Sequence, residues 1–181
     1  GDPENAKKLI DTGVTGIAYE TVTAADGSMP LLAPMSTIAG QLAIVVGSYH
    51  LLKHNKGKGV MIGKLEDIEP RVVSVIGAGV AGTQSISKAL DNHALVKVLD
   101  TSQAKLHQLE SEFGSNNIEY ILSTNDSIQS AINDSDLVVG SVYVVGKEAP
   151  KVVTKDMLAS MNPGTVMVDV SIDQGGCFES S

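Results

Sequence analysis

The chain has 181 residues, of which 43% are hydrophobic, 19% charged and 3% aromatic, a composition typical of a folded globular protein with one sizeable core. Its formal net charge of −8 disfavours a nucleic-acid or an anionic-membrane partner, because both require a basic surface. The single Cys cannot form an internal disulfide, and no signal peptide or bilayer-length apolar run is found, so the expected compartment is the cytoplasm.

The amino-terminal part of the chain predicts a short helix, a strand and a long helix. Asp2 and Pro3 are helix-start signals, and Val14–Tyr19 has the composition of a strand. Ser36 is predicted to cap a long apolar helix that continues to about Leu52, with apolar residues at helical spacing.

This pattern predicts three segments with different roles. Residues 1–34 are interpreted as the remnant of a second domain, 35–55 as a connecting helix and 56–181 as a nucleotide-binding domain. The chain opens on Gly rather than Met, so we expect it to be a fragment or a processed chain.

The central motif of the sequence lies between Arg71 and Asp100. Two β-branched runs, Arg71–Ile76 and Ala94–Leu99, flank a segment with helical spacing and therefore predict a βαβ unit. The first turn carries a GxGxxG motif, and an acid ends the second strand about twenty residues later, as in dinucleotide-binding folds.

Each residue of this motif has a physical role. Gly77 permits a sharp turn, Gly79 allows a pyrophosphate to approach the backbone, and Gly82 allows close packing of helix on sheet. The helix that starts at Val80 presents free N–H groups and a positive dipole end to the phosphates. Asp100 can accept hydrogen bonds from the adenosine ribose, and its charge would repel a 2′-phosphate, which favours NAD over NADP.

The strand and helix alternation continues to the end of the chain. It predicts an α/β fold with a doubly wound parallel sheet, the Rossmann type. The later predicted strands are Ile118–Leu122, Asp136–Val142 and Thr165–Val170, and the predicted helix caps are Thr101 or Ser102 and Thr154.

Ligands of such sheets bind beyond the carboxyl ends of the strands, so the loops there are the candidate site. Ser123 follows the third strand, and Asp173 lies in a Gly-rich loop after the fifth, where it is either a catalytic acid or an exposed loop acid. Lys105 either reaches the adenosine edge or is an exposed helical Lys. Cys177 is interpreted as inert, and the four His residues show no metal-ligand spacing.

Five stretches of the sequence closely resemble the bacterial alanine dehydrogenase family. They are IAYETV at 17–22, PLLAPMS at 30–36, VIGAGVAG at 75–82, VLD at 98–100 and VDVSIDQGGCFE at 168–179. The resemblance covers essentially the whole chain, and the PLLAPMS and IDQGGC stretches are its most specific parts. The NAD-binding subunit of proton-translocating transhydrogenase looks similar over the glycine motif and is the alternative.

The resemblance implies reversible, NAD-dependent oxidative deamination of L-alanine to pyruvate and ammonium, by a homo-oligomer that is typically a hexamer. It implies that Ser36 contacts the cofactor pyrophosphate and that Asp173 is catalytic. The implied cofactor-binding residues are Ser36, Gly77, Gly79, Val80, Ala81, Gly82, Asp100, Lys105, Ser123, Val142, Val170 and Asp173.

Members of the family also place a substrate-binding Arg, a Lys and a catalytic His in an upstream domain. These residues are expected to precede the present sequence, so we expect the 181-residue chain to bind NAD without turning over L-alanine. A third hypothesis, a non-catalytic NAD sensor, stays open on the same ground.

Overall fold

The computed structural model describes residues 3–144 and 148–181, and its contacts divide the chain into two compact units, residues 1–35 and 36–181. The first unit contains α1 (Pro3–Asp11) and a 3₁₀ turn at Tyr19–Thr21. The strand predicted at Val14–Tyr19 is wrong, because no strand among the described residues pairs with it and its side chains are exposed. The β-propensity of a segment depends on such a partner.

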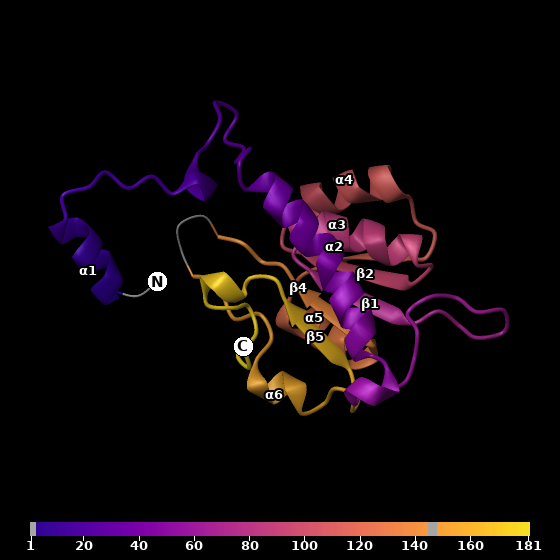
Figure 1. Ribbon diagram of the computed structural model, residues 1–181. Helices are drawn as coiled ribbons and strands as arrows, with labels where there is room; N and C mark the ends of the chain where they lie inside the picture. Colours follow the sequence, from indigo (N-terminus) through magenta and orange to yellow (C-terminus); the bar gives the residue numbers. More distant parts are fainter. Residues whose placement is uncertain (1–2, 145–147) are drawn as a thin grey trace. The chain divides into compact units, whose positions relative to one another are not determined.

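The second unit holds a parallel five-stranded sheet in the order β3-β2-β1-β4-β5 (Figure 1). Its strands are β1 (Val72–Ile76), β2 (Leu95–Asp100), β3 (Ile118–Leu122), β4 (Leu137–Gly140) and β5 (Val166–Asp169). The helices are α2 (Ala33–His50), α3 (Val80–Asp91), α4 (Gln103–Phe113), α5 (Asn125–Asp134) and α6 (Lys155–Leu158). The predicted doubly wound α/β fold is therefore confirmed.

The two faces of the sheet bury different apolar clusters, because side chains alternate along each strand. Val73 and Val75 pack on one face with Ile44 of α2, Ile86 of α3 and Leu106 of α4. On the other face Ile76, Leu99 and Val138 pack with Ile132 of α5 and with Phe178 near the end of the chain. The sheet is thus covered on both sides, which holds the loops at its ends in place.

Helix α2 begins earlier than predicted, at Ala33, so Ser36 lies in its first turn and is not its cap. Its buried face packs on α3: the carbonyl oxygen of Gly40 accepts a hydrogen bond from Ser85 Oγ at 2.8 Å. A Cβ on Gly40 would clash with the backbone of Ala81, so the two helices meet at a glycine. The predicted caps Ser102 and Thr154 do accept hydrogen bonds from the first turns of α4 and α6.

Within residues 3–144 and 148–181, none of the helices combines the length and the apolar character needed to span a bilayer.

Candidate functional site at the carboxyl edge of the sheet

The register of the strands brings the predicted site loops to one edge of the sheet. Ile76 is opposite Leu99 on one side and opposite Gly140 on the other, and Asp100 is opposite Leu122. Strand order reverses between β1 and β4, which is the place where doubly wound sheets bind ligands.

The turn after β1 is closed by β4. Gly77 has a φ of +97°, and a Cβ on it would lie 2.7 Å from the carbonyl oxygen of Ser141. Ser141 Oγ donates a hydrogen bond to the Gly77 carbonyl at 2.8 Å. A Cβ on Gly82 would clash with the Gly77 carbonyl oxygen and would lie 2.8 Å from Ser141 Oγ. The first and third glycines of the motif are therefore required by backbone conformation and packing.

The second glycine is different, because the space beside it is open. Gly79 is exposed, has an ordinary φ of −68°, and a Cβ built on it has no atom within 4 Å. It is the N-cap residue of α3 and makes no side-chain capping bond, so the N–H groups of Val80 and Ala81 are not capped by it. A backbone surface of this kind fits a phosphate group, which a side chain at Gly79 would displace.

Asp100 ends β2 beside this turn. Its Oδ2 accepts a hydrogen bond from the Ala78 N–H at 2.7 Å, and its Oδ1 accepts one from the Ser102 N–H at 2.8 Å. Each carboxylate oxygen has a second lone pair, so the half-buried group can still accept bonds from two vicinal hydroxyls.

The other predicted cofactor residues surround this edge at different distances from the strands. Ser36 is half-buried, one helical turn before Gly40 and on the face of α2 that packs on α3. Lys105 lies in the first turn of α4, where its Nζ contacts Gln108 Oε1 at 3.2 Å and not Asp100. Ser123 follows β3, and its N–H donates to the Asp100 carbonyl at 2.9 Å.

Val142 and Val170 lie just beyond the carboxyl ends of the neighbouring strands β4 and β5. The Val170 N–H donates to the Gly140 carbonyl at 2.8 Å, and the Val142 carbonyl accepts from Ser171 Oγ at 2.7 Å. These two contacts join the loops that follow the two strands.

Asp173 lies in a 3₁₀ turn, Ile172–Gln174, of the loop after β5. Its side chain is exposed and makes no hydrogen bond or ion pair with any residue that the structure describes. Its neighbour Gln174 has a buried Oε1 that finds no donor in the same part of the chain. The exposed Asp173 carboxylate is therefore the group of this turn that a ligand can reach.

The Cys177 thiol lies in the same loop and is fully buried. Burial, followed by the nearby Asp169 carboxylate, raises the pKa of the thiol from 9.0 to about 12. The thiol is therefore protonated at neutral pH, in agreement with its interpretation as inert.

Sequence reasoning missed three residues that shape this edge. Ser141 closes the glycine turn, and Asp169 and Lys151 hold the loop that carries Asp173. For Asp169 the sequence held a signal: an acid stands at the carboxyl end of a predicted strand, directly before a Gly-rich loop whose backbone N–H groups need acceptors. Nothing in the sequence around Lys151 distinguished it from a surface Lys.

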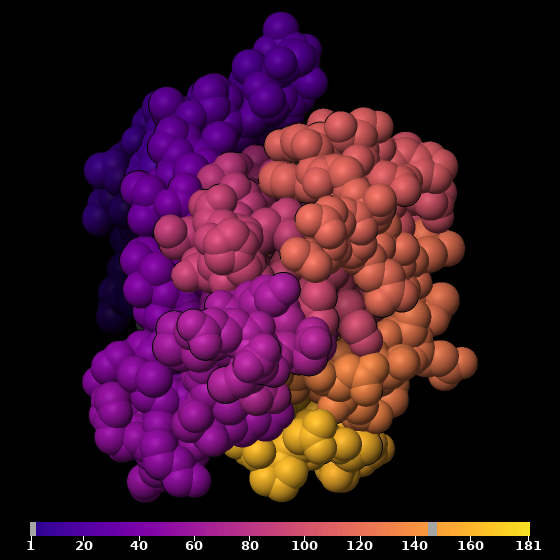
Figure 2. All heavy atoms as spheres, turned by 90° about the vertical axis from the view of Figure 1, so that its right-hand side faces the viewer, coloured from indigo at the N-terminus to yellow at the C-terminus, as the bar shows by residue number. Residues whose placement is uncertain are grey.

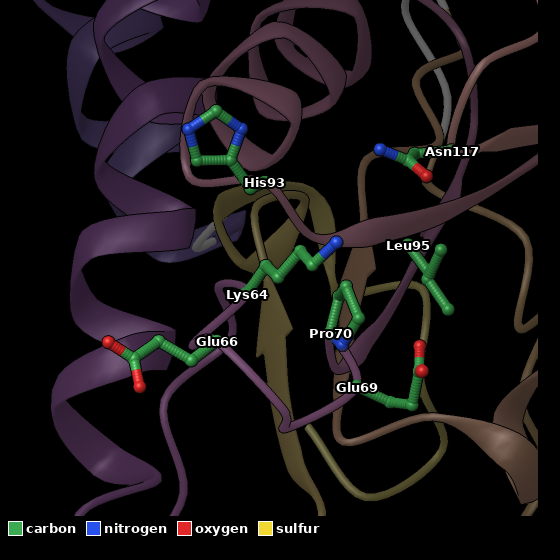
Figure 3. A pocket seen from close by; sticks show the side chains of 7 residues that line it. All are labelled: Lys64, Glu66, Glu69, Pro70, His93, Leu95 and Asn117. Carbon is green, nitrogen blue, oxygen red and sulfur yellow. The ribbon is translucent and has the colours of Figure 1, made fainter.

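A hollow of about 450 Å³ lies at the amino ends of the strands, opposite this site, and is not part of it (Figure 3). It is lined by Lys64, Glu66, Glu69, Pro70, His93, Leu95 and Asn117, which stand at or before the amino ends of β1, β2 and β3. In Figure 2 the magenta 56–70 segment borders the pink surface formed by later residues. The side chains of Lys64 and Glu66 point away from each other. In the described ranges no three His, Cys, Asp or Glu side chains are grouped to hold a metal ion.

Comparison with protein families finds a match over residues 43–181 to the family model described as alanine dehydrogenase/PNT, C-terminal domain. An alanine dehydrogenase of Mycobacterium tuberculosis is 49% identical over 173 residues, which is 96% of this chain and 46% of that protein. The chain thus spans about half the length of the curated relatives it matches.

Two solved structures have the same fold over almost the whole chain. One, titled L-alanine dehydrogenase, is 39% identical with a TM-score of 0.90 and is matched over 98% of this chain and 49% of its own. The other, a transhydrogenase from Sinorhizobium meliloti, is 26% identical with a TM-score of 0.82 and is matched over 100% of this chain and 54% of its own.

Proposed function

The chain belongs to the alanine dehydrogenase/PNT C-terminal domain family, and we propose that it is the NAD-binding domain of an L-alanine dehydrogenase. The observation that carries the cofactor proposal is the pair formed by the open Gly79 turn and the Asp100 carboxylate, at the point where strand order reverses. One fits a pyrophosphate and the other a ribose diol, and both belong to NAD.

In this proposal the turn and the first N–H groups of α3 hold the pyrophosphate, with Ser36 beside them on α2. Asp100 accepts hydrogen bonds from the adenosine ribose, and its negative charge disfavours the 2′-phosphate of NADP. Lys105 and Ser123 line the adenosine end, and Val142 and Val170 line the nicotinamide end.

When bound, NAD would supply the hydride acceptor for the α-carbon of L-alanine, so that L-alanine, NAD⁺ and water would give pyruvate, ammonium, NADH and a proton. Asp173 supplies a carboxylate without a partner in the described chain, and we propose that it holds the substrate ammonium, or the attacking ammonia, in line with the transferred hydride. In the family the remaining acid/base residues come from an upstream domain, so we propose that the 181-residue chain alone binds NAD without turnover.

The experiment is an initial-rate assay of NADH oxidation by the complete natural protein with pyruvate and ammonium together. We expect oxidation that requires both substrates. Hydride transfer from NADH to an NADP analogue in the presence of a partner subunit would instead support the transhydrogenase alternative, which the comparison places at lower identity, 26% against 39%. NADH binding without either reaction would support an NAD sensor.

We also propose that copies of the chain assemble through the exposed face of α2. Ile38, Leu42, Val45 and Tyr49 recur at spacings of four, three and four residues and are 50–60% exposed, with Val46 beside them at 44%. This is the spacing of a helix–helix seam, and α2 has no Asp, Glu, Lys or Arg although the chain carries a net charge of −8.

Five half-exposed side chains present about 100 Å² each, so two copies would bury on the order of 1,000 Å², the lower limit of a specific interface. A second copy is the occupant that we propose, since the seam is uncharged and can pair with itself. Light scattering of the 181-residue chain should give a dimer or larger, and Leu42→Glu should dissociate it whereas Met61→Glu, in an exposed loop, should not. A monomeric wild-type chain would contradict this assembly.

The cytoplasmic location stays a prediction from the single cysteine.

A further inference from the structure

The loop after β5 is held from both sides by two charged side chains that neither the family match nor the sequence motifs assign. The Asp169 carboxylate accepts hydrogen bonds from the loop's donors, and the Lys151 ammonium donates to its carbonyls. The donors to Asp169 are Ser171 N at 3.0 Å, Cys177 N at 2.8 Å, Phe178 N at 3.2 Å, Ser181 Oγ at 2.5 Å and the Cys177 thiol at 3.4 Å. The acceptors for Lys151 are the carbonyl oxygens of Gly175, of Gly176 at 2.8 Å and of Phe178 at 3.1 Å.

The backbone of this loop curls tightly around the carboxylate. Gly175 and Gly176 both have positive φ values, +86° and +74°, and a Cβ on Gly176 would lie 2.8 Å from Asp169 Oδ2. The loop therefore reverses direction with its N–H groups pointing inward to Asp169, while Lys151 binds carbonyls of the same turn. A backbone arrangement with so many polar groups in one place needs both charges to satisfy them.

Asp173 lies between the two ends of the loop that Asp169 holds, at residue 171 and at residues 177–178. Its own side chain is exposed and makes no hydrogen bond within residues 3–144 and 148–181. Among the residues that the structure describes, the loop backbone and no side-chain contact sets the position of its carboxylate.

We propose that Lys151 and Asp169 are positioning residues that fix the loop of residues 170–181 and thereby place Asp173 for hydride transfer. The catalytic part of this inference rests on the proposed alanine dehydrogenase function, whereas the fixing of the loop does not. Lys151 acts as a clamp on the carbonyls of the turn, and Asp169 acts as the acceptor around which the turn is folded.

Lys151→Met and Asp169→Asn test the two positioning residues separately. Met removes all three donated bonds. Asn puts an NH₂ donor where one of the two carboxylate oxygens faces backbone N–H groups, so at least one bond is lost in either orientation. Lys151→Arg is the conservative variant, because it keeps a cation that can donate to several carbonyls.

The first readout is kinetic, in the complete natural protein with pyruvate, ammonium and NADH. We expect kcat to fall about 10- to 100-fold in Lys151→Met and Asp169→Asn, since a misplacement of about 1 Å costs as much. The KM for NADH should rise far less than kcat falls, because Gly79 and Asp100 are untouched and only Val170 and Asp173 of the proposed cofactor residues lie in the loop, and Lys151→Arg should recover most of kcat. A general structural defect would not give this split. An unchanged kcat in both variants would overturn the proposal.

The second readout does not depend on activity. Cys177 is the single Cys of the 181-residue chain, is buried in this loop, and its N–H is one of the donors to Asp169. Modification of Cys177 by a thiol reagent should become on the order of tenfold faster in Lys151→Met and should stay slow in Lys151→Arg. In Asp169→Asn the loss of the carboxylate charge by itself lowers the pKa of the thiol, so Lys151→Met is the variant that reports on the loop. If the complete protein does not act on L-alanine, the proposed function fails. Faster modification of Cys177 would still support the fixing of the loop, and an unchanged modification rate would contradict it.

Discussion

The substitution Gly79→Ala separates binding from folding at the glycine turn. Gly79 has an ordinary φ of −68°, and a Cβ there meets no atom within 4 Å, so the folded chain accommodates the methyl group. The weaker N-cap preference of Ala and the lower entropy of the unfolded chain are small opposing effects. We therefore expect the free energy of unfolding to change by less than about 0.5 kcal/mol.

Binding of NADH should respond much more strongly, because the new Cβ occupies the place where the pyrophosphate approaches the backbone. The loss of one charge-assisted hydrogen bond costs about 1.5–3 kcal/mol, which is about a 10- to 150-fold increase in Kd. NADH fluorescence titration of the 181-residue chain measures Kd, and urea denaturation of the same samples measures stability.

Gly82→Ala is the matched control, since its Cβ would meet the Gly77 carbonyl and Ser141 Oγ inside the fold. It should lower the free energy of unfolding by about 1–3 kcal/mol, the usual cost of overpacking. If Gly79→Ala leaves the Kd for NADH unchanged, the turn after β1 does not hold the phosphates and the reasoning is refuted.

Two further predictions concern Asp100 and Cys177. Asp100→Ser should weaken NADH binding about tenfold or more, through the lost ribose contact, and should bring the Kd for NADPH closer to that for NADH; a retained preference for NADH would contradict the role of Asp100. The pKa of Cys177 in the folded chain is about 12, so alkylation by iodoacetamide should be negligible at pH 8 and become fast only in urea. Because this pKa is raised on folding, the associated stability is fully present below pH 9.0 and is lost as the pH rises toward 12, which urea unfolding between pH 8 and pH 11 would detect.

The part of the site that sequence reasoning predicted well depends on the regularity of parallel sheets. Once the strands were identified, their carboxyl ends had to share one edge, and Gly77, Asp100 and Ser123 indeed lie there. The fold itself was predictable from the alternation of strands and helices, and the bounds of β3 were predicted to the residue.

The errors arose where distant contacts decide the outcome. Val14–Tyr19 has the residues of a strand but no partner, and Ser36 resembles a cap although Ala33 already begins the helix. The predicted fourth strand, Asp136–Val142, is longer than β4, because Ser141 turns toward Gly77 to close the glycine turn. Contacts of this kind join residues about 60 positions apart, so no local sequence pattern predicts them.

The central claim is that the loops at the carboxyl edge form an NAD site in which Asp173 acts on the substrate. The most direct test is Asp173→Asn in the complete natural protein, with Asp91→Asn, an exposed acid at the far end of α3, as the control. The account predicts that NADH oxidation with pyruvate and ammonium falls at least about 100-fold in Asp173→Asn, with the Kd for NADH unchanged, and that Asp91→Asn behaves as wild type. Full activity in Asp173→Asn would contradict it.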